Sequence, residues 1–182
     1  MNSKRFGWYT IGLHTVLVMC GLLILLLARE NRQLEERLYQ SSVAAAGGPE
    51  IDALLPELSV TELDGVESVL AFDGLAHDSV VLVFTTTCPA CKRNLEHWRD
   101  LHENFGDRYR FVAVSLDPPE ATRRYTEQND LPFRVVMPAD RSAFQRAYGI
   151  TSVPQTLVVG TDGRLKDVQP GVLLPTFRDR LG

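Results

Sequence analysis

One segment near the N-terminus constrains this chain more than any other. The stretch from Trp8 to Ala28 contains no Asp, Glu, Lys or Arg and includes the unbroken apolar run 22–27. As a helix it would extend roughly 31 Å, about the thickness of the hydrocarbon core of a bilayer. Trp8 and Tyr9 stand where an interfacial aromatic belt is expected. The sequence therefore predicts a membrane-spanning helix over residues 8–28.

A cleaved signal peptide is the main alternative for this stretch. Lys4 and Arg5 would form its basic start, but the apolar region exceeds the usual ~7–15 residues, and no Ala-x-Ala-like cleavage site precedes Arg29. A lipoprotein signal ending at Cys20 is disfavoured by the bulky Met19 before it. We therefore expect an uncleaved single-span anchor. Basic residues flank it almost equally on both sides, so charge does not decide its orientation.

The remaining chain divides into a connecting segment and a larger domain. Residues 1–28 hold the N-terminal segment and the anchor, and residues 29–49 read as a polar stalk and a small, Gly-rich linker. Leu34 and Leu38 share one helix face, but a single repeat favours a solvated stalk over a coiled coil. Residues 50–182 are long enough to bury one core.

Composition excludes several classes of protein. The 182 residues carry 19 Lys+Arg against 23 Asp+Glu, for a formal net charge of −4, and 45% are hydrophobic. These values exclude a strongly disordered chain, and the mild acidity argues against nucleic-acid binding. Three cysteines are too few for a disulfide-built miniprotein.

Residues 50–182 alternate between strand and helix patterns. A hairpin is predicted over 60–70 with its turn at Asp64-Gly65. Further strands are predicted at 79–84, 110–116, 133–137, 155–159 and 164–168, and helices at 89–105, 119–128, 142–148 and 174–181. The strands at 79–84 and 110–116 are apolar throughout most of their length, which is typical of strands buried on both faces. The expected fold class is α/β, with a mixed sheet flanked by helices on both faces.

Two cysteines lie where the strand at 79–84 gives way to the next helix, in the order Cys88-Pro89-Ala90-Cys91. At this spacing both thiols lie within one helical turn and can form a disulfide. The helix N-terminus favours the thiolate of Cys88, whereas Cys91 is expected to be more buried. The pattern predicts thiol–disulfide exchange, in which Cys88 attacks a substrate disulfide and Cys91 resolves the mixed disulfide.

Other interpretations of the cysteine pair fit less well. A zinc site would need further ligands, yet there is no second cysteine pair, and His97 and His102 lie on or beside the apolar stripe of the helix. An inert disulfide over so short a loop would constrain the chain little. We therefore expect neither a metal nor another cofactor. The third cysteine, Cys20, lies in the predicted span and is expected to act as a small apolar residue.

A proline also stands at the entrance of the strand 155–159. Pro154 lacks an N–H and needs a special setting at that position. A cis peptide bond between Val153 and Pro154 would supply one. The alternative is an ordinary trans proline in a loop.

Together these residues resemble the thioredoxin superfamily, and more closely its membrane-anchored TlpA/ResA-like thiol-disulfide oxidoreductases. The resemblance covers about 52–180 and rests on the run 80–84 before the cysteines, on 147–150, on Val153-Pro154-Gln155-Thr156 and on 161–164. It implies a thioredoxin-like fold with catalytic Cys88 and Cys91. It also implies that Pro154 is cis and packs beside the cysteines, that the backbone of Val153 meets the substrate, and that Thr87, Pro89 and Ala90 belong to the active-site loop.

The sequence departs from the family pattern at four positions. Thr87 replaces a common Trp, Leu82 stands where thioredoxins have a buried Asp, and Asn94 stands where several relatives have Glu. No acidic proton carrier for Cys91 is therefore visible. Pro89 comes first between the cysteines, as in more oxidising relatives. The direction of electron transfer stays open.

The expected function is disulfide exchange with protein thiols or disulfides outside the cytoplasm, where disulfides persist. The expected location is the inner (cytoplasmic) membrane, with the C-terminal domain facing the periplasm or the cell exterior. A redox partner would reset the cysteine pair. One alternative is a peroxiredoxin-like thiol peroxidase, because Thr85 lies three residues before Cys88. The other is a redox-silent docking module of the same fold.

Overall fold

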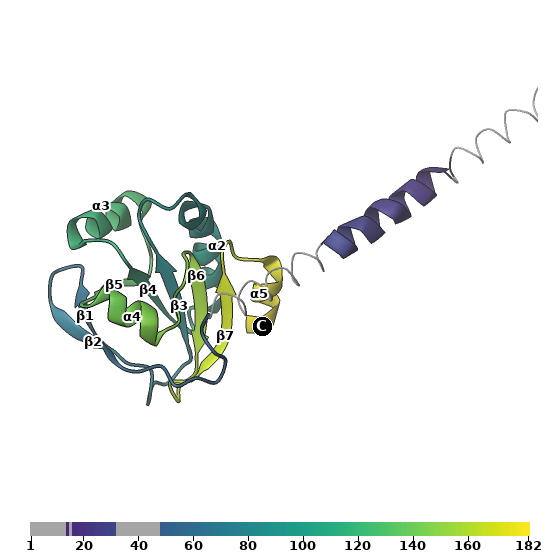
Figure 1. Ribbon diagram of the computed structural model, residues 1–182. Helices are drawn as coiled ribbons and strands as arrows, with labels where there is room; N and C mark the ends of the chain where they lie inside the picture. The colour runs from purple at the N-terminus through teal and green to yellow at the C-terminus, as the bar shows by residue number, and fades with distance from the viewer. Residues whose placement is uncertain (1–13, 15, 32–47) are drawn as a thin grey trace, which may run out of the picture. The chain divides into compact units, whose positions relative to one another are not determined.

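The computed structural model describes residues 14, 16–31 and 48–182. The chain divides into two compact units, Met1–Ala44 and Ala45–Gly182 (Figure 1).

The first unit contains a helix over residues 16–31. Its apolar side chains from Val16 to Leu27 are each more than half exposed. Within the described ranges, the structure contains no helix that is both long enough and apolar enough to cross a membrane. The predicted aromatic belt at Trp8 and Tyr9, and the stalk and linker over 32–47, lie outside the described residues.

The second unit alternates between strands and helices. Its elements are β1 (Leu58–Glu62), β2 (Glu67–Leu70), β3 (Ser79–Phe84), α2 (Pro89–Phe105), β4 (Arg110–Ser115), α3 (Pro119–Asn129), β5 (Arg134–Pro138), α4 (Arg141–Ala147), β6 (Gln155–Val159), β7 (Leu165–Pro170) and α5 (Pro175–Leu181).

One mixed sheet connects all of these strands, in the order β2-β1-β5-β4-β3-β6-β7. The central strands β3, β4 and β5 are parallel, whereas β6 runs antiparallel to β3. The carboxyl ends of the three parallel strands therefore meet at one edge of the sheet. The start of β6 lies at the same edge, because Gln155 pairs with Val83 near the end of β3.

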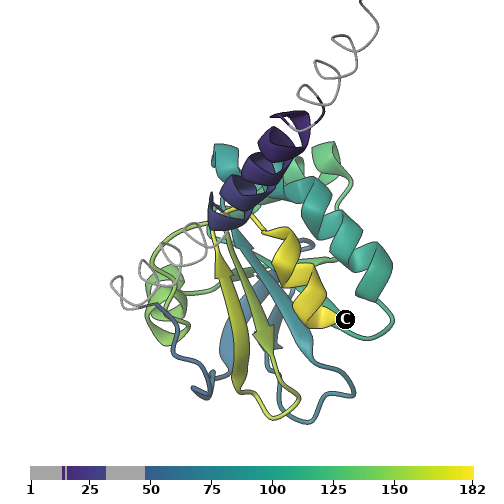
Figure 2. The same cartoon turned by 90° about the vertical axis from the view of Figure 1, so that its right-hand side faces the viewer.

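Helices cover both faces of the sheet, as the sequence predicts (Figure 2). On one face, α2 and α5 pack on the central strands, with Leu82, Trp98 and Phe177 in a common core. The Trp98 indole N–H also donates a hydrogen bond of 3.0 Å to the Thr156 hydroxyl, which ties α2 to β6. On the other face, α4 brings Phe144 onto Tyr148, with ring centroids 4.6 Å apart.

The predicted elements are present, and β3 and α2 have the predicted bounds. Both follow from local signals, namely an apolar β-branched run and a proline that opens a helix with an apolar stripe. Other ends shift by one or two residues. The strand predicted at 133–137 is β5 at 134–138, since its Pro138 pairs with Val60 of the hairpin, a long-range contact that local patterns do not contain.

Gly149 marks the place where the preceding chain joins the domain. Its φ of +62° is in the left-handed region, and a Cβ there would lie 2.6 Å from the backbone of Pro49. Pro49 is buried. Position 149, the second residue after α4, is therefore glycine for two reasons, the backbone conformation and the close approach of residues 48–49.

We predict that Gly149→Ala destabilises the domain more than Gly74→Ala does. Gly74 has a similar φ of +68°, but a Cβ added there would meet nothing within 4 Å, so it controls for the conformational cost of about 1–2 kcal/mol. Gly149→Ala should cost about 1–3 kcal/mol more, since a backbone must move. Urea unfolding of the full chain, followed by tryptophan fluorescence, measures both; equal losses would contradict the Pro49 contact.

Candidate active site

Cys88 is the N-cap residue of α2. Its backbone is extended, with φ −79° and ψ 116°, and Pro89 begins the helix. The backbone N–H of Cys91 donates a hydrogen bond to the Cys88 Sγ over 3.2 Å. One of the N–H groups that a helix N-terminus leaves without a backbone partner therefore points at this sulfur. The predicted place of Cys88 at the start of the helix is found.

Cys91 lies one turn further along α2 and is fully buried. Burial, reinforced by the hydrogen bond with Cys88, raises the pKa of the Cys91 thiol to about 12. Both cysteines are free thiols in the structure, with Cys88 half-buried. The pair thus consists of one accessible sulfur and one protonated, shielded sulfur.

The loop before β6 meets the cysteines from the other side. The peptide bond between Val153 and Pro154 is cis. The Val153 carbonyl accepts a hydrogen bond of 3.8 Å from the Cys88 Sγ. Strand register explains this meeting, since β3 leads to Cys88 and β6 begins beside the end of β3. The structure thus brings together four residues singled out from the sequence: Cys88, Cys91, Val153 and Pro154.

The other predicted loop residues surround Cys88 in sequence and lie at the surface. Thr87 and Pro89 are exposed and Ala90 is half-buried. None of their side chains makes a hydrogen bond within the described part of the chain. They are available to a partner that reaches Cys88.

Asn94 has a structural role that the sequence did not reveal. It is fully buried. Its Nδ2 donates to the Gly171 carbonyl over 3.1 Å, and its Oδ1 accepts from the Leu173 N–H over 2.8 Å. Gly171 in turn donates its N–H to the Pro154 carbonyl over 2.7 Å. Asn94 therefore connects the helix of the cysteines to the loop of Pro154 through Gly171.

Asp117 is a second residue that the sequence analysis missed. Its Oδ2 accepts hydrogen bonds from the Thr86 N–H, at 2.5 Å, and from the Thr86 hydroxyl, at 2.7 Å. It therefore holds the loop two residues before Cys88. A signal existed, because Asp117 directly follows the predicted strand 110–116, and a polar side chain at that edge of a sheet is available to a site.

Tyr125 contributes a polar group beside the thiols. Its ring packs on Phe84, with centroids 5.6 Å apart, and its buried hydroxyl has no hydrogen-bond partner among the described residues. Burial, then the neighbouring charges of Cys91 and Cys88, raise the pKa of Tyr125. The phenol is thus a neutral neighbour of the cysteine pair.

Comparison with known proteins places this arrangement in a family. The family model described as AhpC/TSA matches residues 51–168, which is more than half of the chain. The chain belongs to the AhpC/TSA family. The matched segment of this AhpC/TSA protein includes the cysteine pair and the Pro154 loop.

Two curated relatives are similar to this chain in sequence. The thiol-disulfide oxidoreductase ResA of Halalkalibacterium halodurans is 27% identical over 137 residues, covering 71% of this chain and 71% of ResA. The thioredoxin-like protein YneN of Bacillus subtilis is 23% identical over 140 residues, covering 75% of this chain and 81% of YneN. The predicted resemblance to ResA-like proteins and the predicted enzyme class, thiol-disulfide oxidoreductase, are confirmed.

Solved structures show the same fold. StoA from Bacillus subtilis matches with a TM-score of 0.57 and 16% identity, covering 70% of this chain and 97% of StoA. The thioredoxin domain of a thiol-disulfide oxidoreductase from Bacteroides vulgatus matches with a TM-score of 0.62 and 17% identity, covering 73% and 99%. The predicted thioredoxin-like α/β fold is therefore confirmed for the second unit.

We predict that Asn94→Ala lowers the free energy of unfolding by about 1–3 kcal/mol, because the Gly171 carbonyl and the Leu173 N–H lose their partner. Asn104→Ala on the same helix is the matched control, since Asn104 is exposed and its side chain, within the part of the chain that the structure describes, bonds to Asp100 alone. Urea unfolding measures both. Equal stability of the two variants would show that the Asn94 bonds do not matter.

A second prediction concerns Cys91 in a chain carrying Cys20→Ser and Cys88→Ser. Burial is the largest cause of the raised pKa of Cys91 and remains when Cys88 is replaced. Alkylation by iodoacetamide should therefore be slow at about pH 8 and keep rising about tenfold per pH unit beyond about pH 9, the range where an ordinary thiol levels off. The same chain unfolded in urea is the control. A rate that levels off near pH 9 would contradict the raised pKa.

Proposed function

We propose that this protein is a membrane-anchored oxidoreductase that exchanges disulfides with protein substrates outside the cytoplasm through Cys88 and Cys91. One observation carries the proposal. The Cys88 Sγ accepts a hydrogen bond from the Cys91 N–H and also lies 3.8 Å from the Val153 carbonyl oxygen. The reactive sulfur and a loop backbone that a substrate chain can follow are therefore adjacent.

The reaction proceeds in two balanced steps. The Cys88 thiolate attacks one sulfur of a substrate disulfide, a bond to that sulfur forms, and the other substrate sulfur leaves as a thiolate. Cys91 then attacks the Cys88 sulfur and releases the first substrate sulfur. The Cys91 proton passes to the released thiolate. The substrate gains two electrons, and Cys88 and Cys91 become a disulfide. The reverse sequence of steps oxidises a substrate dithiol. In either direction, a redox partner returns the two cysteines to their starting state.

The environment of Cys91 supports these separate roles, with Cys88 as the attacking thiolate and Cys91 as the resolving thiol. Its pKa of about 12 keeps it protonated at neutral pH, so it does not compete with Cys88 for the substrate. Asn94 offers no exchangeable acid, because an amide has no titratable proton, and both ends of this amide bond to backbone groups. The substrate thiolate is thus the proton acceptor nearest to the reaction.

The anchor and the location belong to the same proposal. The apolar side chains of the helix 16–31 are each more than half exposed from Val16 to Leu27, as expected of a surface that lipid covers. A dithiol exchanger held at a membrane acts where disulfides persist, which is outside the cytoplasm. The location proposed is the cytoplasmic membrane with residues 50–182 on its outer side.

The test is a trapping experiment with the full chain expressed in its host. Cys91→Ser should accumulate mixed disulfides through Cys88, because the resolving thiol is absent. Non-reducing electrophoresis detects the adducts, and mass spectrometry identifies the partners. Exported proteins are expected among them.

Two variants control the trap. Cys91→Ser combined with Cys88→Ser should capture nothing, and Cys91→Ser combined with Cys20→Ser should capture as much as Cys91→Ser alone. Absence of any adduct would overturn the exchange function. Adducts made only with cytoplasmic proteins would overturn the proposed location.

A further inference from the structure

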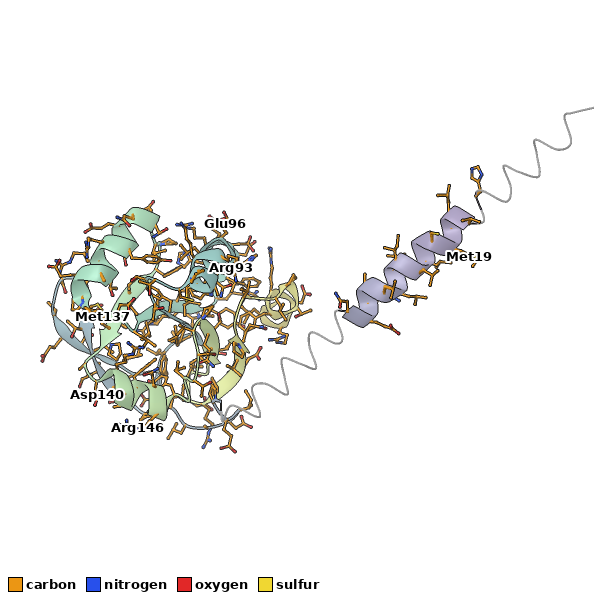
Figure 3. All side chains as sticks on the ribbon, turned by 45° about the horizontal axis from the view of Figure 1, so that its top comes forward. Met19, Arg93, Glu96, Met137, Asp140 and Arg146 are labelled. Carbon is orange, nitrogen blue, oxygen red and sulfur yellow. The ribbon has the colours of Figure 1, made fainter. Side chains whose placement is uncertain are left out.

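A pocket of about 440 Å³ lies beyond the cysteine pair, at the carboxyl ends of β4 and β5. Leu116 and Met137 line it and are almost fully buried, so they form its floor. Three prolines that are partly or fully exposed stand around it: Pro118, Pro119 and Pro138. Figure 3 shows Met137 near the junction of β5 and α4. The thiol exchange itself uses none of these residues.

The pocket is connected to the reactive cysteine. Asp117 lines it and accepts both hydrogen bonds from Thr86, two residues before Cys88. β3, β4 and β5 are neighbouring parallel strands, so their carboxyl ends follow one another along one edge. Two strand spacings amount to roughly 10 Å, which an extended peptide covers in about three residues.

The pocket also presents a positive charge. Arg141 lines it and is exposed, and within the described residues its guanidinium has neither a hydrogen bond nor an ion pair. Two carboxylates, Asp117 in the lining and Asp140 beside Arg141, keep their negative charges, and their recorded hydrogen bonds go to other groups than Arg141. Asp117 accepts from Thr86, and Asp140 accepts from the Ala143 N–H over 2.9 Å. A carboxylate brought to this pocket therefore finds an unpaired cation.

We propose that this pocket is a substrate subsite. It binds an apolar side chain about three residues from the target cysteine, with an acidic residue directly beside that side chain. The apolar group packs on Leu116 and Met137, and the carboxylate pairs with Arg141. The inference rests on the proposed exchange at Cys88 and specifies which polypeptides that exchange prefers.

The experiment uses the full chain in detergent with Cys20→Ser and Cys91→Ser, so that Cys88 is the one remaining thiol. Each probe is a short peptide whose cysteine is joined to nitrothiobenzoate. The Cys88 thiolate attacks the peptide sulfur, the new disulfide joins Cys88 to the peptide, and the aryl thiolate leaves. The colour of that thiolate reports the rate.

Three peptides probe the two contacts: Cys-Gly-Ser-Leu-Glu, the same peptide ending in Lys, and the same peptide with Ser in place of Leu. Each is also made in reverse order, so that both chain directions are sampled. The Leu-Glu peptide should react about two- to fivefold faster than the Leu-Lys peptide, the range of an exposed ion pair. This ratio should approach one in about 1 M salt. The peptide without Leu should be slower than its Leu-containing parent.

Arg141→Glu should abolish or invert the preference for the acidic peptide. Arg146→Glu is the matched control, because Arg146 is exposed on the same helix but lines a separate hollow with Ser142 and Thr151. Arg146 is labelled in Figure 3 farther along α4 than Asp140. Its substitution should leave the ratio unchanged.

Two outcomes separate this inference from the function on which it rests. If all peptides react with Cys88 at one rate in both directions, and Arg141→Glu changes nothing, the subsite is wrong and the exchange function stands. If no peptide forms an adduct with Cys88, the exchange function fails and the subsite fails with it.

Discussion

The N-cap of helix α2 is Cys88, whose sulfur accepts a hydrogen bond from the Cys91 N–H, and the chemistry of this protein depends on that contact. The Cys91 N–H that a Ser or Asp side chain would satisfy in most helices is directed at the Cys88 Sγ. The same turn that exposes Cys88 to a partner draws Cys91 into the core. Two identical side chains three residues apart thereby acquire different surroundings and different access, which an exchange reaction in two steps requires.

Neutral hydrogen bonds connect α2 to the other elements of the site. The Asn94 amide and the Gly171 backbone link α2 to the Pro154 loop, and the Trp98 indole links α2 to β6. A carboxylate at position 94 would offer a proton acceptor near Cys91 but could not donate to Gly171. The protein has an amide there, which favours a fixed geometry over proton transfer. Proton exchange in this site is then left to the substrate sulfur.

The sequence predicted those parts of the molecule that depend on neighbouring residues. The apolar run of β3, the proline that opens α2 and the cysteine spacing are local, and their bounds and places agree with the structure. The meeting of Cys88 with Val153 could be expected only through family resemblance, since it depends on the register of β6 against β3. The partners of Asn94 and Asp117 could not be predicted, because they lie 77 and 31 residues away, although the place of Asp117 directly after a predicted strand marked it as a candidate.

The contact between Pro49 and Gly149 gives the preceding chain a fixed point of entry. Gly149 lies four residues before Val153, in the loop that reaches Cys88. In mechanical terms, residues 48–49 and the loop before β6 form one packed contact within the domain, so a change at either one reaches the other.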